Sequence, residues 1–262
     1  MRLDKVVLVF KKDWIEVRRN WQVTLPIIIV PLMISVLLPV LLTTISHITG
    51  SSGASLSDFE NLIRNMPTHV QERVKIMSEK QAMVYIMALY FFAQFFLIIP
   101  LMASSVITSD SFAGEKERKT IEALLATPIS DGELFLGKIL VSFIPSMTVT
   151  IISFVIYSIT FDILSYNMFN GELLLPNIDW LLLIFCLAPY AAKVKGFREA
   201  QQISAILLVP ILALVFGQLS GAIFFGAQII VLLTIIFGVI DLIIFKIGVR
   251  LFKREEVLLK LI

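Results

Sequence analysis

The first feature of this sequence that could do chemistry is a phosphate-loop spacing. The tract GELFLGKI, at 132–139, matches G-x-x-x-x-G-K, in which backbone amides surround phosphates and the lysine reaches them. Ile139 replaces the serine or threonine whose hydroxyl binds magnesium, and an apolar helix is predicted here in place of a strand and loop. We interpret the match as chance and expect that the chain does not hydrolyse ATP by itself.

Other catalytic or metal-binding patterns are absent from the sequence. The two histidines, His47 and His69, are not at a metal-ligand spacing, and the single cysteine, Cys186, lies in an apolar run. Neither H-E-x-x-H nor G-x-S-x-G occurs. We therefore expect no metal site, no cofactor bound by this chain and no enzymatic activity of its own.

Two polar residues lie inside apolar tracts and are candidate functional residues. Asp241, in FGVIDLIIFKIGVR, has no basic residue three or four positions away that would neutralise it within a helix. It could help to coordinate a cation or face an aqueous cavity, or it could simply contact water or a neighbouring helix, and both interpretations stay open. For Gln94, a structural hydrogen bond between helices is the favoured role.

The most polar tract within the apolar part of the chain is SFAGEKERKTIEALLATPIS, at 111–130. It predicts a helix at about 112–127 that has one narrow apolar stripe and that ends at Pro128. SDGE, at 130–133, has the spacing of a capping box and predicts that the next helix starts at once. The helix at 112–127 is either a solvated loop helix or a surface that binds a partner.

Composition identifies an integral membrane protein. Apolar residues make up 58% of the 262 residues, charged residues only 16%, and the mean hydropathy is +0.91. The run at 24–45 contains no charge and exceeds the roughly 20 residues that a helix needs to cross a bilayer. Because the net charge is only +2, we expect no nucleic acid among the partners.

The apolar runs predict an all-α, polytopic membrane helical bundle with about six transmembrane helices. The predicted spans are about 23–45, 83–108, 136–161, 173–192, 201–220 and 223–247. This topology puts eighteen Lys and Arg residues on the side of the termini and four on the other side, which places both termini in the cytoplasm. The fourth span is the least regular, since its clean apolar run, 180–192, covers only about 20 Å of helix.

The remaining segments complete a single transmembrane domain, 23–262, preceded by an amphipathic helix at 1–22. In that helix apolar residues recur at three- and four-residue spacing, with lysines and arginines on the other faces. It either anchors the chain at the membrane lipid surface or acts as an elbow that braces the first span. The capping-box spacing at 57–60 predicts an outer helical cap at about 50–80, and the same spacing at 78–81 predicts the helix start that opens the second span.

A family resemblance adds to this interpretation. The tract SFAGEKERKTIEALLATPISDGELFLGK resembles the segment that follows the second span in type-2 ABC exporter permeases, most closely in the sodium-efflux and multidrug branch. KVKGFREAQQIS, at 193–204, and FKKDWIEVRRN, at 10–20, resemble two further segments of that family. Lys119 stands where many members have glycine, and the short fourth span departs from the family pattern.

The resemblance implies a permease subunit of an ATP-driven exporter in a prokaryotic inner or plasma membrane. A separate ATP-binding subunit would use ATP and magnesium, and a second permease, identical or different, would complete the substrate path. The helix at 112–127 would be the coupling helix that docks on the ATP-binding subunit. Its polar contacts would come from Glu115, Glu117, Arg118 and Glu122, and its apolar anchor from Ile121 and Leu124.

Two other functions remain open on sequence alone. An ATP-independent channel or secondary carrier is suggested only by the helices and Asp241, and it predicts activity without any ATPase. An intramembrane enzyme is the third possibility and lacks the expected side chains. The sequence does not determine the transported substrate or the choice between homodimer and heterodimer. It also leaves open whether the short span at 173–192 crosses the membrane and leaves the permease functional.

Overall fold

The computed structural model describes the N-terminal two-thirds of the chain and part of one later helix. The described residues are 2–48, 63, 64, 66, 68–111, 127–176, 231, 232, 234–236, 238, 239, 242 and 243. Every regular element among them is a helix, as the all-α prediction requires. Of the six predicted spans, the first three fall in the described residues, and the other three lie wholly or mostly outside them.

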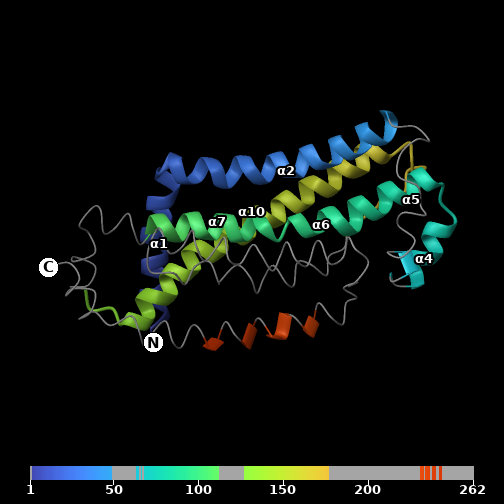
Figure 1. Ribbon diagram of the computed structural model, residues 1–262. Coiled ribbons are helices and arrows are strands. Elements are labelled where there is room, and N and C mark those ends of the chain that lie inside the picture. The colour runs from blue at the N-terminus through green and yellow to red at the C-terminus, as the bar shows by residue number, and fades with distance from the viewer. Residues whose placement is uncertain are drawn as a thin grey trace.

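The helices are arranged around one long central helix, α10, which spans Asp131–Ser165. The other helices are α1 (Leu3–Arg19), α2 (Trp21–Ile48), α4 (Thr68–Lys75), α5 (Glu79–Ile86), the π-helix η3 (Met87–Phe91), α6 (Phe92–Phe95) and α7 (Ile98–Ser109). Figure 1 shows α10 crossing diagonally beneath α2, with α1 at the end of the bundle where α10 starts and α4 and α5 at the opposite end. α10 packs against α1, α2 and α7.

Two described helices, α2 and α10, are long and apolar enough to cross a membrane. The 35 residues of α10 span about 52 Å at 1.5 Å per residue, well beyond a hydrocarbon core of about 30 Å. The surface of α2 supports the same assignment, because many of its large apolar side chains are exposed. These residues are Ile28, Ile29, Leu32, Met33, Val36, Leu37, Val40, Leu41 and Ile45.

Both capping boxes that precede predicted spans are confirmed. The Ser130 hydroxyl accepts a hydrogen bond from the Glu133 backbone N–H at 3.3 Å, and the Glu133 carboxylate accepts one from the Ser130 N–H at 3.0 Å. Ser78 and Gln81 form the equivalent pair in front of α5. These local bonds fix where α10 and α5 begin, because they satisfy backbone donors that have no partner within the helix.

Small hydroxyl residues line the buried face of α10. The hydroxyls of Ser142, Ser146 and Thr150 donate to carbonyls of the same helix at 2.9, 2.5 and 2.7 Å. Their polar groups are therefore satisfied within α10, and their small size allows neighbouring helices to approach closely.

The second predicted span, 83–108, differs from a continuous helix. It starts earlier, at Glu79, and is divided into α5, η3, α6 and α7, with a turn at Phe96 and Leu97. The Tyr157 hydroxyl, on α10, donates a 2.8 Å hydrogen bond to the Ala88 carbonyl within η3. A π-segment disturbs the regular backbone hydrogen bonds of a helix. In lipid, a side chain from a neighbouring helix can provide a hydrogen bond to a backbone group that has lost its partner. The interruption therefore depends on a contact with a distant part of the chain.

Replacing Tyr157 with phenylalanine should destabilise this interruption while keeping the edge-to-face contact with Phe96, whose ring centroid lies 5.1 Å away. The variant loses one buried hydrogen bond, which is worth about 1 kcal/mol, so we expect its thermal midpoint in detergent to fall by about 3 °C. The control is Tyr166→Phe, since Tyr166 is 63% exposed. Equal midpoints for the two variants would show that the Tyr157 hydroxyl does not support η3.

Candidate functional site

The candidate site lies where the polar tract at 112–126 leaves the end of α7 and returns to the start of α10. We call this end of the bundle the junction and define it by Asp13, Ser111, Pro128 and Lys138. The tract itself lies outside the described residues, whereas both of its flanks are described. The structure therefore shows what holds the two ends of the tract in place.

A buried ion pair forms the centre of the junction. Lys138 Nζ, on α10, lies 3.3 Å from Asp13 Oδ2, on α1, and each side chain is only 2% exposed. Lys138 also donates to the backbone oxygen of Ser111 at 3.0 Å and to its hydroxyl at 2.9 Å. The Ser111 hydroxyl donates to Asp13 Oδ2 at 2.9 Å. Three segments that are far apart in sequence thus share one hydrogen-bonded cluster.

The cluster satisfies the charges that it buries. Unpaired ions are costly to remove from water, and a buried pair is tolerated when hydrogen bonds satisfy its remaining donors and acceptors. Lys12 Nζ lies 3.2 Å from Asp13 Oδ1 and supplies a half-exposed partner for the second carboxylate oxygen. The directional bonds from Lys138 fix the end of α7, through Ser111, relative to α1 and α10.

The N-terminal end of α1 holds the other flank of the tract. The Lys5 ammonium donates to the Pro128 carbonyl, and the Arg2 backbone N–H donates to Glu133 Oε1 at 2.6 Å. At the opposite end of α1, the Asn20 side-chain amide donates to Asp110 Oδ1 at 2.9 Å. α1 is therefore bonded to both flanks, and it lies along the junction as Figure 1 shows.

Close helix packing reinforces this arrangement. A Cβ atom added at Gly137 would lie 2.6 Å from Val9 Cγ1 and 2.7 Å from Val9 Cβ. Only glycine allows α10 to approach α1 this closely. Val6, Val9 and Val17 form the buried apolar face of α1 on either side of Asp13. One face of α1 thus packs on the bundle, while the exposed Leu3, Leu8 and Ile15 lie on other faces.

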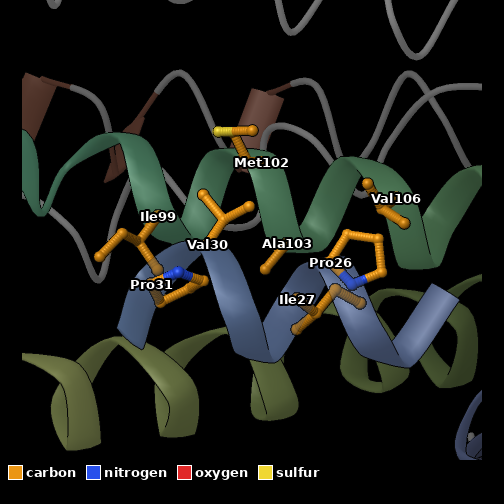
Figure 2. Close-up of a pocket in the computed structure, with 8 residues that line it drawn as sticks. All are labelled: Pro26, Ile27, Val30, Pro31, Ile99, Met102, Ala103 and Val106. Carbon is orange, nitrogen blue, oxygen red and sulfur yellow. The ribbon is translucent and has the colours of Figure 1, made fainter. Parts of the chain in front are cut away.

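A groove between α2 and α7 is a second feature that could hold a ligand (Figure 2). Its lining consists of Pro26, Ile27, Val30, Pro31, Ile99, Met102, Ala103 and Val106. The cavity is about 40 Å³, whereas sites for drug-sized ligands have about 300 Å³ or more. These side chains offer no hydrogen-bonding group except the weakly accepting Met102 sulfur. The groove suits a hydrocarbon group and is too small to enclose a drug-sized molecule.

Comparison with known proteins decides the family. A family model described as ABC-2 family transporter protein matches residues 7–231, most of the chain. The chain belongs to the ABC-2 transporter family. No curated protein and no solved structure shows significant similarity to it. This family consists of transmembrane permease subunits that lack an ATPase site of their own. The ABC-2 chain is therefore a membrane-embedded permease. Membership of the family implies that a separate ABC ATP-binding subunit is its partner.

Most residues that the sequence singled out for the ABC-2 permease site lie outside the described part of the structure. These are Glu115, Glu117, Arg118, Ile121, Glu122, Leu124 and Asp241. Gln94 lies in α6, and its side chain is not among those described. Their predicted roles remain predictions. Among the described residues, no group of three or more His, Cys, Asp or Glu residues could hold a metal ion.

Sequence reasoning did not assign a shared role to three residues of the ABC-2 junction: Asp13, Ser111 and Lys138. Asp13 follows Val6 and Val9 and precedes Val17 at helical spacing, so it is a carboxylate on an otherwise apolar stripe. Lys138 lies within the apolar helix α10, two turns after its start. A buried acid and a buried base of this kind are candidates for an ion pair. The sequence does not show that the two meet.

Proposed function

We propose that this ABC-2 permease is the transmembrane subunit of an ATP-driven exporter related to the sodium-efflux and multidrug branch. A separate ATP-binding subunit binds and hydrolyses ATP with magnesium, and this chain binds neither. Two permeases, identical or different, enclose the substrate path in a prokaryotic cell membrane. Both termini and the junction face the cytoplasm, where the ATP-binding subunit is found.

In this proposal the tract at 112–127 is the coupling helix. Glu115, Glu117, Arg118 and Glu122 contact the ATP-binding subunit through polar groups, and Ile121 and Leu124 anchor the helix in an apolar groove. The observation that carries the proposal is the bracing of both flanks of this tract, by Lys138 at Ser111 and by Lys5 at Pro128. A docking helix whose ends are fixed can transmit a rigid-body motion of its partner to the spanning helices.

The capping box at Ser130 adds a direct mechanical connection. Because α10 begins at Asp131, only a few residues separate the proposed coupling helix from a helix that continues for 35 residues. Motion at the junction must therefore move α10, which packs on α1, α2 and α7. The contacts of α10 would distribute that motion through the bundle.

The test is to purify the tagged chain from its native membranes in mild detergent, identify the proteins that accompany it and assay ATP hydrolysis. We expect a stoichiometric partner that carries a phosphate loop and hydrolyses ATP. Transport by the purified chain in vesicles without any ATP-binding partner would contradict the proposal and support a secondary carrier or channel.

A further inference from the structure

The buried cluster at the junction raises a question about α1. An anchor at the membrane surface needs apolar and basic side chains, but it does not need a carboxylate in its packed face. Asp13 is nevertheless in the packed face of α1, where it is 2% exposed and bonded to both other segments of the junction. An apolar residue at this position would pack on α10 without the desolvation of a charge.

We propose that Asp13, Ser111 and Lys138 are positioning residues that fix the direction in which the chain leaves α7 relative to α1 and α10. This inference rests on the proposed function, because it assigns the direction a role in coupling. The Lys138 ammonium bonds simultaneously to a carboxylate on α1 and to a backbone oxygen at the end of α7. α1 is then part of the coupling assembly rather than an accessory anchor.

The chemistry of the pair explains why the junction uses ions instead of apolar contacts. Apolar packing is non-directional, so it would hold α1 against α10 without fixing where the end of α7 lies. The cluster instead fixes the position of the Ser111 backbone through a 3.0 Å bond to a buried cation. Buried polar groups can specify one arrangement even when an apolar replacement would be equally stable.

Single and double variants of the Asp13–Lys138 pair separate positioning from stability. The single variant Lys138→Met leaves the buried Asp13 with the Ser111 hydroxyl and, as its remaining described cation, the half-exposed Lys12, and we expect its thermal midpoint to fall by about 10 °C. The double variant Asp13→Leu/Lys138→Met removes both charges, and we expect it to recover most of the wild-type midpoint. A control is Glu172→Gln, which breaks an exposed ion pair with Arg73 at the other end of the bundle.

Two readouts are measured on the double variant in the full chain. The first is the distance distribution between nitroxide labels at Leu8 and Met102, both exposed, with Cys186 replaced by serine. The second is ATP hydrolysis by the partner subunit bound to the permease in lipid vesicles. We expect a broadened or shifted distribution and at least a fivefold loss of hydrolysis, with partner binding retained and the Glu172→Gln control unchanged.

A stable double variant with an unchanged distance distribution and normal ATP hydrolysis would overturn the inference, because the pair would then be only structural. If the wild-type chain bound no ATP-binding subunit, the proposed function would fail. The distances between the labels would still show whether the Asp13–Lys138 pair positions the end of α7. A changed distribution would support that positioning role, and an unchanged one would reject it. The two failures are therefore distinguishable.

Discussion

Replacing Gly137 with alanine should separate α1 from α10. The added Cβ would lie 2.6 and 2.7 Å from two atoms of Val9, a β-branched side chain with little rotameric freedom. Alanine would otherwise stabilise the middle of a helix by up to about 1 kcal/mol relative to glycine. Overpacking costs about 1–3 kcal/mol, so the net effect should be a fall in thermal midpoint of several degrees, and Gly137→Leu should prevent accumulation of folded protein.

Gly238 provides the matched control for this substitution. It also lies in a helical segment, and a Cβ atom added there has nothing within 4 Å. Gly238→Ala should therefore leave the midpoint unchanged or raise it slightly. Combining Gly137→Ala with Val9→Ala should recover only the part of the lost stability that is due to Val9 Cγ1, because the Cβ atom of residue 9 stays 2.7 Å from the added methyl group. Equal effects of the two glycine substitutions would show that close packing of α1 on α10 is not required.

Replacing Glu117 and Arg118 together with alanine should abolish coupling without preventing membrane insertion. Both residues lie in the proposed coupling helix, and truncating two interfacial charges commonly costs more than the 1.4 kcal/mol that corresponds to a tenfold change in affinity. We expect at least a tenfold fall in the amount of ATP-binding partner that is recovered with the chain and in the rate of ATP hydrolysis by the complex. Folded permease in the membrane fraction should remain at the wild-type level.

The control for that double variant removes one acid and one base elsewhere. Glu72 and Lys75 are exposed on α4, at the end of the bundle opposite the junction. Glu72→Ala/Lys75→Ala leaves the net charge unchanged, as the test variant does. We expect this control to bind the ATP-binding partner and to support ATP hydrolysis as the wild-type chain does. Normal coupling by the Glu117 and Arg118 variant would refute the role assigned to the tract at 112–127.

Local sequence signals predicted the helix starts well. Ser78 with Gln81 and Ser130 with Glu133 form capping boxes that depend only on residues three positions apart, so the sequence contains all the information that they need. The interruption of the second span was not predictable in this way. Its π-segment is bonded to Tyr157, almost seventy positions away in the chain, and a window of apolar residues cannot reveal that contact.

The junction shows the same limit. The sequence indicated that the tract at 111–130 is a distinct polar segment, but it did not indicate what holds the flanks. Lys138 counts in the sequence only as one of the basic residues that favour the cytoplasmic side, and Asp13 only as one acid in a basic amphipathic helix. Their pairing depends on the packing of α1 against α10 at Gly137, which is a tertiary contact. Only the folded arrangement shows that the two charges neutralise each other.

The most direct test of the account is a photoactivatable residue at Ile121 in the full-length permease, irradiated in native membranes. We expect a crosslink to a protein with a phosphate loop, and we expect the Glu117 and Arg118 double variant to lose it. Labelling at Ile76, an exposed residue directly after α4, provides the comparison for nonspecific capture. Crosslinking from Ile121 only to lipid or to a second copy of the permease would contradict the proposal that this tract binds an ATP-binding subunit.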